Sequence, residues 1–374
     1  MTTAFPKRVA LVHDHLNQIG GAEKVLEVFH EIFPNAPVYT LVHDTELTAG
    51  RYRDWDIRTS FLQRLPGGIR HFKWYLTLMP RAFESFDLSG YDVILSDSSA
   101  FSKGVRPSPD TLHISYCHTP TRYLWSDRQS YVDELQAPWV VKKVLPYFQR
   151  KLRAWDELAS DRVNTFIANS HFVADRIFRY YRRESVVIYP PVDVTAFRAI
   201  PSDPSDRYLV VSRFRPYKRV DLAIEACNHL RRNLDVIGSG EDETRLRRIA
   251  GPTVRFLGRV DDLRPHYARA RAFLHPQEED FGISAVEAMA TGCPVIAYGV
   301  GGARESVEDG ASGVFFDRQN ASSLVRAIER FESMDFDRAQ IRDRALRFRR
   351  ERFMDDVRAF IAERWERFHA RRET

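Results

Sequence analysis

Short apolar segments rich in β-branched residues alternate with amphipathic stretches along the first half of the chain. The apolar segments, which predict buried strands, lie at residues 8–13, 38–42, 91–96, 112–117, 165–168 and 186–189. After the first of them, Ala22, Val25, Leu26 and Phe29 share one face of a predicted helix. Strands that alternate with helices indicate a mostly parallel sheet covered by helices on both faces.

A second series of the same kind follows a polar, proline-rich stretch at residues 200–206. Its predicted strands lie at residues 208–212, 234–237, 254–257, 272–275 and 294–297. Helical spacing recurs between them, for example at Val220, Ala223, Ile224 and Cys227. We place a domain boundary near residues 190–206 and predict two Rossmann-like α/β domains, at residues 1–195 and 196–350.

The end of the chain, from residue 337, predicts an arginine-rich amphipathic helix. Its apolar stripe consists of Phe353, Val357, Phe360, Ile361, Trp365 and Phe368. The alternative is an arm that binds nucleic acid, but an apolar stripe favours a helix docked on the body of the protein. We treat residues 351–374 as this final helix.

Composition narrows the class of protein. The 374 residues carry a net charge of only +5, which argues against a nucleic-acid partner. Three cysteines, Cys117, Cys227 and Cys293, lie far apart in apolar runs, which excludes a disulfide scaffold and suits a reducing cytosol. The chain shows no signal-peptide core and no run of 18 apolar residues. We therefore expect a cytoplasmic protein, or one peripheral on the cytosolic face of the inner membrane.

Two loops contain residues suited to a phosphorylated ligand. Gly20 and Gly21, between the first strand and the first helix, would let a ligand approach the backbone and the helix N-terminus. The alternative is a tight turn that requires glycine. Arg213 and Lys218 follow the first strand of the second domain and could clamp a diphosphate, or belong to a solvated basic loop. Neither a GxGxxG nor a GxxxxGK[ST] motif occurs, which disfavours dehydrogenases and P-loop enzymes.

Acidic residues cluster after the strand at 272–275. Glu279 and Asp280 are expected on the following loop, beside Phe281 and Gly282, and Glu287 in the first turn of the next helix. Carboxylates there suit the vicinal hydroxyls of a sugar or ribose. The structural alternative for Glu287 is a capping box with Ser284.

Three further features carry weaker signals. His118 follows the strand at 112–117, and a structural and a functional role are equally expected for it. Two stretches, 70–86 and 139–155, mix aromatic and basic residues as at the surface of an anionic bilayer. The alternative for either stretch is an ordinary amphipathic helix whose basic side chains reach solvent.

Taken in order, these motifs resemble those of the retaining glycosyltransferases of family 4, which have the GT-B fold. The similarity extends over nearly the whole chain, and the motifs that carry it are Gly20-Gly21-Ala22-Glu23, His118-Thr119-Pro120, Arg213 with Lys218, Gly238-Ser239-Gly240-Glu241, residues 256–260, Glu279-x7-Glu287, residues 292–297 and Gly301-Gly302-x-x-Glu305. The sequence around Glu279 looks most like that of bacterial mannosyltransferases that use GDP-mannose in polysaccharide assembly. Asp280 departs from the glycine that many members have there.

The resemblance implies a GT-B fold: two Rossmann-like domains facing across a cleft, with the final helix crossing back to the N-terminal domain. The N-terminal domain would then bind the acceptor and contact a membrane, and the C-terminal domain would bind the donor. Residues assigned to acceptor or membrane contact are Asp14, Lys73, Trp74, Lys142 and Lys143. The partners implied are a nucleotide-sugar donor and a lipid-linked saccharide acceptor.

Site roles also follow from the resemblance. Arg213 and Lys218 would neutralise the donor diphosphate, with backbone at Gly20 and Gly21. The sugar would be held by Glu279 and by N–H groups of Phe281, Gly282 and Ile283, with His118 beside it. The remaining donor contacts implied are Glu287 to the ribose, the backbone of Arg259 and Val260 to the base, and Gly238. The residues expected in catalysis are His118, Arg213, Lys218 and Glu279.

The expected reaction retains the sugar configuration and is independent of metal, since two cationic side chains serve the diphosphate. Alternatives within the fold are a UDP-sugar-dependent transferase, an epimerase, or a synthase with a soluble acceptor. Outside enzymes, the alternative is a non-catalytic nucleotide-sugar binder, against which the complete set of Arg213, Lys218, Glu279 and Glu287 argues.

Overall fold

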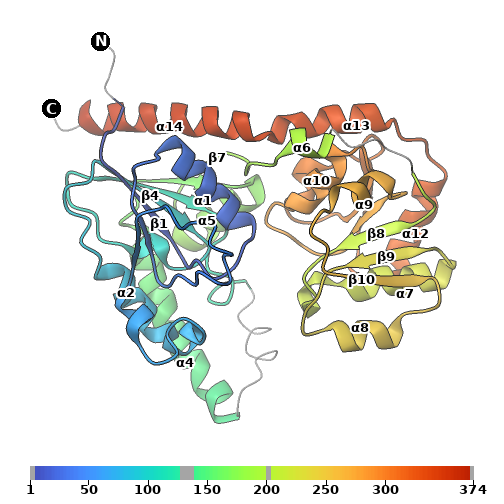
Figure 1. Ribbon diagram of the computed structural model, residues 1–374, viewed down its shortest axis with the longest axis horizontal. Coiled ribbons are helices and arrows are strands. Elements are labelled where there is room, and N and C mark those ends of the chain that lie inside the picture. The colour runs from blue at the N-terminus through green and yellow to red at the C-terminus, as the bar shows by residue number, and fades with distance from the viewer. Residues whose placement is uncertain (1–4, 127–138, 199–203, 371–374) are drawn as a thin grey trace. The chain divides into compact units, whose positions relative to one another are not determined.

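The computed structural model describes residues 5–126, 139–198 and 204–370 (Figure 1). The chain divides into two compact units: Met1–Tyr189 with Met354–Thr374, and Pro190–Phe353. Of the sequence features above, residues 1–4, 199–203 and 371–374 lie outside the described residues, as do the side chains of residues 139–141.

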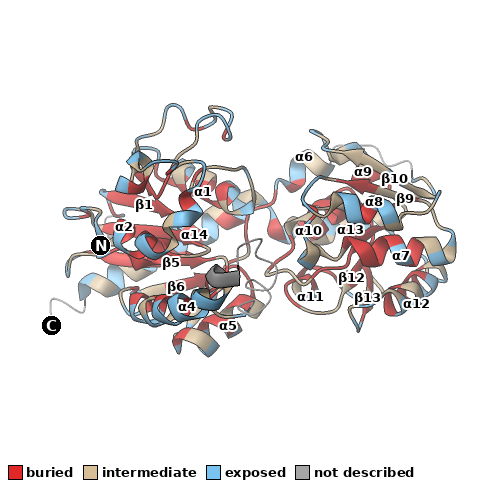
Figure 2. Ribbon diagram, turned by 90° about the horizontal axis from the view of Figure 1, so that it is seen from below, coloured by how far each residue is buried: buried red, intermediate tan, exposed pale blue. Residues whose placement is uncertain are grey.

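The first unit is built on a parallel sheet of seven strands in the order β3-β2-β1-β4-β5-β6-β7. The strands are β1 Val9–His13, β2 Val38–Thr40, β3 Ile57–Thr59, β4 Val93–Ser98, β5 Leu112–Cys117, β6 Thr165–Ala168 and β7 Ser185–Val187. The central strands β1, β4 and β5 are buried along their whole length, as Figure 2 shows for β1 and β5. Burial on both faces accounts for their continuous apolar runs.

Helices cover both faces of this sheet. Figure 1 shows α1 on one face and α2 and α4 on the other. The helices and 3-10 turns are α1 Gly21–Ile32, η1 Phe61–Arg64, η2 Phe72–Leu78, α2 Met79–Glu84, η3 Ser102–Gly104, α4 Trp139–Ser160 and α5 His171–Tyr181. One hydrophobic cluster joins β1 and β4 to η2, α2 and α4, through Ala10, Ile94, Phe72, Phe83 and Leu152.

The second unit holds a parallel sheet of six strands in the order β10-β9-β8-β11-β12-β13. The strands are β8 Tyr208–Val211, β9 Leu234–Ile237, β10 Val254–Gly258, β11 Phe273–His275, β12 Val295–Tyr298 and β13 Gly313–Phe316. Figure 1 shows α9 and α10 on one face and α7 and α8 on the other. The helices and 3-10 turns are α6 Val194–Arg198, η4 Pro216–Lys218, α7 Val220–Leu230, α8 Glu243–Ile249, α9 Arg264–Arg269, α10 Ile283–Ala290, α11 Ala303–Ser306, α12 Ala321–Glu332, α13 Arg338–Ala345 and η5 Leu346–Phe348.

The predicted pair of parallel Rossmann-like sheets is confirmed. Two strands were not predicted: β3, a three-residue edge strand that is only partly buried, and β13, the opposite edge of the second sheet. The strand predicted at 91–96 begins two residues later, at Val93, because Tyr91 and Asp92 precede the buried run.

The predicted final helix is α14, Arg350–Ala370, and its residues from Met354 onward group with the first unit. A separate helix, α13, and the turn η5 precede it, so the segment from residue 337 is not one continuous helix. Phe353, Val357, Phe360 and Ile361 of the predicted stripe are buried. The other two, Trp365 and Phe368, are partly exposed, so the buried stripe is shorter than predicted.

Candidate functional site

Strand order reverses at one place in each sheet. In the first sheet, β2 and β3 lie on one side of β1 and β4 lies on the other; in the second, β9 and β10 lie on one side of β8 and β11 lies on the other. In open parallel sheets, ligands bind beyond the carboxyl ends of the strands at such a reversal. Ligand sites are therefore expected where β1 meets β4 and where β8 meets β11.

Four titratable side chains gather at the reversal in the first sheet. His13 ends β1 and pairs in register with Asp97 of β4, and His118 directly follows β5. His13 Nδ1 donates to Asp97 Oδ2 at 2.8 Å, and His118 Nε2 donates to Asp97 Oδ1 at 2.5 Å. On the other side of His13, its Nε2 lies 3.8 Å from Oε1 of Glu23 in α1. These groups, Glu23, His13, Asp97 and His118, form the strand-end cluster.

The strand-end cluster is closed at one end and open at the other. Glu23, His13 and Asp97 are 1%, 2% and 1% exposed, whereas the side chain of His118 is 13% exposed. An ionised carboxylate only accepts hydrogen bonds, so both imidazoles present an N–H to Asp97. His118 is therefore the member that a ligand can reach.

Mutual contacts in the cluster outweigh the cost of burying charge. Burial lowers the pKa of His13, but the hydrogen bond to Asp97 and the nearby carboxylates of Asp97 and Glu23 raise that pKa to about 10. Burial raises the pKa of both carboxyls, but contacts with the imidazoles outweigh it. His118 and His13 lower the pKa of Asp97 below its ordinary value, and His13 lowers the pKa of Glu23. At neutral pH the cluster therefore holds a protonated His13 between two carboxylates.

The sequence prediction found only one member of this cluster. His118 lies at the end of the predicted strand, but His13 and Asp97 were not singled out, and Glu23 was noted only as part of a motif. A polar residue ends each of β1, β4 and β5 or directly follows it. Comparison of the ends of predicted neighbouring strands is the signal that would have grouped them.

Asp14, directly after β1, anchors the loop that follows β4. Its Oδ2 accepts the N–H groups of Ser99 and Ala100 at 2.7 and 2.8 Å. Its Oδ1 accepts those of Phe101 and Ser102, both at 2.8 Å. The buried carboxylate thus fixes the backbone beside the cluster, and its contact with an acceptor stays a prediction.

The two glycines before α1 have ordinary backbone angles. Gly20 is the N-cap of α1 with φ −153° and ψ −160°, an extended conformation that any residue adopts. Gly21, the first residue of the helix, does not have a positive φ either. The alternative of a turn that requires glycine is therefore wrong. What glycine provides here is the absence of a side chain beside the first N–H groups of α1.

At the reversal in the second sheet, two loops meet because β8 and β11 pair directly. Arg213, which is exposed, follows β8, and Lys218 ends η4 on the same loop. Glu279 lies on the loop after β11. The Nζ of Lys218 forms an ion pair with Oε1 of Glu279, so the two residues that the sequence assigns to the diphosphate and the sugar are in direct contact.

Two buried side chains lie behind Glu279. Gln277 Nε2 lies 3.3 Å from Oε1 of Glu279 and 3.2 Å from Nδ1 of His275. Burial lowers the pKa of His275 to about 4, so this imidazole is neutral at pH 7. The amide of Gln277 therefore connects a neutral histidine to the carboxylate of the Lys218–Glu279 ion pair.

Helix α10 begins directly after this loop. Its N-cap is Gly282, with φ +87°, and no side chain caps the helix. The alternative of a capping box is therefore wrong, since Ser284 lies inside the helix and Glu287 lies one turn further along than predicted. Glu287 is buried, and burial together with its charge raises the pKa of Tyr267 well above the ordinary value.

Glycines let the loops at this edge touch backbone to backbone. Gly238 follows β9 with φ +137°, and a Cβ there would lie 1.8 Å from the carbonyl oxygen of Ser212. Gly302 donates its N–H to the carbonyl of Glu279 at 2.9 Å, and a Cβ on it would lie 2.3 Å from Cα of Phe281. Glycine is thus required where the loops bearing Arg213 and Glu279 are supported.

The residues predicted for the base, Arg259 and Val260, directly follow β10. They lie at the same carboxyl edge as Gly238, because β9 and β10 are parallel neighbours. The structure thus gathers the predicted donor residues on the loops of the second unit at one edge of its sheet, whereas Glu287 lies inside α10.

Two family models match the chain. The model described as Glycosyltransferase Family 4 matches residues 19–196, and the one described as Glycosyl transferases group 1 matches residues 195–348. Together they cover residues 19–348 without a gap. The chain belongs to glycosyltransferase family 4.

Two curated relatives illustrate how far the similarity extends. This family 4 chain is 30% identical over 213 residues to the D-inositol 3-phosphate glycosyltransferase of Streptomyces bingchenggensis, covering 47% of the chain and 46% of the relative. It is 31% identical over 181 residues to the GDP-mannose-dependent alpha-(1-6)-phosphatidylinositol monomannoside mannosyltransferase of Mycobacterium tuberculosis, covering 40% and 47%. The chain thus spans about half the length of the curated relatives it matches.

The fold is also found among solved structures. The crystal structure of Anabaena Alr3699/HepE in complex with UDP matches with a TM-score of 0.71 and 17% identity, covering 96% of this chain and 100% of that one. The predicted GT-B class, with two parallel Rossmann-like sheets and a C-terminal helix, is confirmed.

The aromatic and basic stretches of this family 4 chain are partly core and partly surface. Phe72, Leu152 and Trp155 belong to the cluster that joins η2, α2 and α4 or pack against it. The surface part, which we call the aromatic-basic surface, carries exposed Lys73, Trp74, Lys143, Tyr147 and Phe148, with Lys142 partly buried. Trp74 is 75% exposed. No helix in the described part of the chain is long and apolar enough to cross a membrane.

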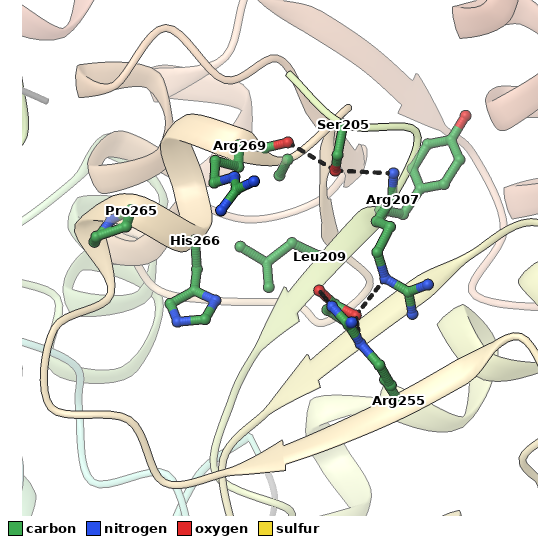
Figure 3. Close-up of a pocket in the computed structure, with 10 residues that line it drawn as sticks. Ser205, Arg207, Leu209, Arg255, Pro265, His266 and Arg269 are labelled. Atoms are coloured by element: carbon green, nitrogen blue, oxygen red, sulfur yellow. Dashed lines mark hydrogen bonds and ion pairs between the residues drawn. The ribbon is translucent and has the colours of Figure 1, made fainter. Parts of the chain in front are cut away.

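A cavity of about 420 Å³ lies at the opposite edge of the second sheet (Figure 3). Figure 3 shows Arg207 and Arg255 close together, and both donate to Asp235, at 2.5 and 2.9 Å. The cavity is lined by residues at the amino ends of β8, β9 and β10 and by α9. It therefore contains none of the predicted donor residues. Across residues 5–126, 139–198 and 204–370, no three His, Cys, Asp or Glu side chains are grouped to hold a metal ion.

Proposed function

We propose that this chain is a retaining glycosyltransferase that moves a hexose from a nucleotide sugar to an acceptor hydroxyl. The observation that carries the proposal is the Lys218–Glu279 ion pair at the strand reversal of the second sheet, with Arg213 on the same loop as Lys218. It holds a cation suited to a diphosphate in contact with a carboxylate suited to sugar hydroxyls. A donor that enters this edge exchanges the ion pair for its own phosphate and hydroxyl groups.

The proposal includes further contacts with the donor. The N–H groups of Phe281, Gly282 and Ile283, at the start of α10, join Glu279 on the sugar. Glu287 binds the ribose, and the backbone of Arg259 and Val260 meets the base. The proposal also assigns the diphosphate to the first N–H groups of α1, beside which Gly20 and Gly21 place no side chain.

The reaction needs no acidic side chain of the protein as a base. The acceptor oxygen bonds to C1 of the sugar on the face from which the diphosphate leaves, as the bond from C1 to the phosphate oxygen breaks. The proton of the acceptor hydroxyl passes to that oxygen, so the products are the glycoside and the protonated nucleoside diphosphate. Arg213 and Lys218 stabilise the charge that develops on the diphosphate, and His118 lies beside the reacting sugar.

We further propose that the donor is GDP-mannose. Support comes from the resemblance of the sequence around Glu279 to mannosyltransferases and from the GDP-mannose-dependent relative in Mycobacterium tuberculosis. The competing donor class is a UDP sugar, since the Anabaena structure of the same fold holds UDP.

A thermal-shift panel tests both parts of this proposal. It compares GDP-mannose, GDP, UDP-glucose, UDP-GlcNAc and UDP without added metal. A ligand at about 100 times its Kd should stabilise the protein by about 2.7 kcal/mol. A shift with the GDP compounds alone supports GDP-mannose, a shift with the UDP compounds alone rejects it but keeps the transferase, and no shift with any compound contradicts the transferase.

Matched variants locate the ligand in this experiment. Glu287→Gln should lose most of the shift, because it removes the proposed ribose contact from a buried position. Arg330→Ala is the control. It removes a cation of α12 that forms an exposed ion pair with Asp309, and it should keep the full shift.

We propose that the acceptor is a lipid-linked saccharide approached at an anionic membrane surface through the aromatic-basic surface. Its exposed Trp74, Tyr147 and Phe148 suit the headgroup region, and Lys73, Lys142 and Lys143 suit acidic lipids. The protein then works on the cytosolic face of the inner membrane.

Co-sedimentation with vesicles tests the membrane contact. The protein should sediment with phosphatidylglycerol-containing vesicles and remain in solution with phosphatidylcholine alone. Trp74→Ala should weaken sedimentation at least threefold, whereas Leu47→Ala, which removes an apolar side chain 61% exposed outside this surface, should not. Equal sedimentation of wild type and Trp74→Ala contradicts the proposal.

A further inference from the structure

The strand-end cluster of the first unit contains three titratable side chains besides His118, the histidine proposed to lie beside the sugar. Asp97 carries an imidazole on each of its two oxygens, at 2.8 and 2.5 Å. Neither oxygen of Glu23 has a hydrogen-bond partner in the described part of the chain, and its ion pair is with His13. Burial of two carboxylates this close is costly unless a cation lies between them.

Charge balance gives His13 a defined part. The positive charge of a protonated His13 lies between the two carboxylates and offsets part of their negative charge. His13 lies between Glu23 and Asp97, whereas His118 lies at the open end of the cluster. His13 is therefore enclosed between two carboxylates, and His118 is the member of the cluster that faces a ligand.

We infer that His13 is a positioning residue for the proposed reaction: its positive charge holds Asp97, and Asp97 in turn holds His118 with Nε2 inward and Nδ1 outward. Nδ1 of His118 has no hydrogen-bond partner among the described residues, so it is the atom offered to the donor sugar or the acceptor. This inference rests on the proposed function, because only that places a sugar beside His118. Asp97 and Glu23 belong to the same device, and none of the three touches the substrate.

Other titratable groups also surround His13. Burial lowers the pKa of the His15 imidazole, and burial and the charge of Asp97 raise that of the Tyr116 hydroxyl, so both are neutral at pH 7. Asp14 is engaged by four backbone N–H groups. The titratable groups in contact with His13 are Glu23 on α1 and Asp97 on β4. Those next to this pair are Asp14 and His15 after β1, and Tyr116 and His118 on and after β5.

A double-mutant cycle tests whether His13 acts through His118. His13→Gln removes the charge but keeps an N–H donor, and it should lower kcat at least tenfold while KM for the donor changes less than threefold. In a His118→Ala background the same substitution should change kcat less than twofold, because the group it positions is gone. Loss of kcat by the same factor in both backgrounds, or no loss in either, overturns the inference.

His113→Gln is the matched control. His113 is also a buried histidine of β5, but its nitrogens lie 2.9 Å from Ser96 Oγ and 3.2 Å from the Arg162 carbonyl, outside the cluster. Burial lowers its pKa to about 4, so it is neutral where His13 is charged. Its replacement should leave kcat within twofold. A tenfold loss there too would show that kcat responds to any buried histidine in this sheet and would overturn the inference.

Spectra of the ring nitrogens test the inference without any activity. In ¹⁵N-histidine-labelled wild type at pH 8, His13 should show two protonated nitrogens and His118 a slowly exchanging Nε2–H. The His118 signal should be lost in His13→Gln and kept in His113→Gln. A neutral His13, or a His118 signal that survives in His13→Gln, overturns the inference even if sugar transfer is found. The predicted spectra without transfer from any donor would instead reject the proposed function alone.

Discussion

The two strand reversals offer charged groups to a ligand in opposite ways. At the first, the strand-end cluster lies at the ends of neighbouring strands and in α1, and three of its four residues are at most 2% exposed. At the second, the charged groups are on loops, and the side chains of Lys218 and Glu279 are 17% and 23% exposed. Glycines at positions 238 and 302 bring those loops into backbone contact.

The difference indicates two kinds of site. Buried charges cannot change partners without a large cost in free energy. The first reversal, between β1 and β4, therefore holds one arrangement and presents a single histidine, and we call it the first edge. Partly exposed charges are screened by water and exchange partners readily. The second reversal, between β8 and β11, which we call the second edge, can therefore open its ion pair for a charged ligand. We therefore expect substitutions at the second edge to affect turnover, and those at the first edge to affect stability and its pH dependence as well.

The largest effect is expected at the second edge, on turnover. Lys218→Ala and Arg213→Ala should each lower kcat roughly 10²–10³-fold, because each removes a preorganised charge from the leaving diphosphate. Thermal unfolding of both variants should stay close to wild type, since both side chains are on a surface loop. Near-wild-type turnover in both variants would remove the clamp from the mechanism, and Arg330→Ala is the control for loss of a surface cation.

The backbone contact at that edge should be the next most sensitive. Gly238→Ala should destabilise the protein by roughly 3 kcal/mol or more, because its Cβ would meet the Ser212 carbonyl at 1.8 Å in a left-handed backbone. Gly258→Ala has a similar conformational cost, with φ +68°, but no atom within 4 Å of its Cβ, and should lose only about 1 kcal/mol. Urea unfolding compares the two, and equal losses would mean that conformation alone matters.

The buried cluster should reveal itself in the pH dependence of stability. The pKa of His13 is about 10 in the folded protein against 6.5 for an ordinary histidine, so its contribution is complete below pH 6.5 and is lost as pH rises through 10. Wild type should therefore lose roughly 2–4 kcal/mol more unfolding free energy between pH 6.5 and 9.5 than His13→Gln does. Parallel stability curves for the two proteins would contradict a charged His13.

The smallest effect is expected for an exposed ion pair. Arg330 and Asp309 are bonded at 2.9 Å, but their side chains are 48% and 43% exposed. Arg330→Ala should cost less than about 1 kcal/mol of unfolding free energy, and less still in high salt. A loss as large as that of the buried cluster would break the distinction between the two edges.

Strand predictions succeeded where burial leaves a continuous apolar run. β1, β4 and β5 are central and buried throughout, so their residues are apolar on both faces. Burial is not the whole account at the edges of the sheets, since the partly buried edge strands β7 and β10 were predicted whereas the largely buried edge strand β13 was not. Arg58 of β3 is exposed, and an alternation this short has no distinctive period.

The sequence predicted those site residues that lie close together along the chain. Glu279 through Glu287 form one continuous segment, and Arg213 with Lys218 another, so motifs could find them. His13 and Asp97 are 84 residues apart, and only the pairing of β1 with β4 brings them together. The start of α10 was misread because Ser284 and Glu287 have capping-box spacing, whereas a left-handed Gly282 begins the helix instead.

The anomer of sugar released from a nucleotide sugar tests the central claim most directly. Wild type is incubated with GDP-α-mannose, and with a UDP-α-sugar if the thermal panel favours it, and the first sugar formed is followed by proton NMR before it mutarotates. The account predicts the α anomer, with formation slowed at least 100-fold in Lys218→Ala and unchanged in Arg330→Ala. Initial formation of the β anomer, or equal rates in wild type and Lys218→Ala, would contradict a retaining transferase that works at the edge between β8 and β11.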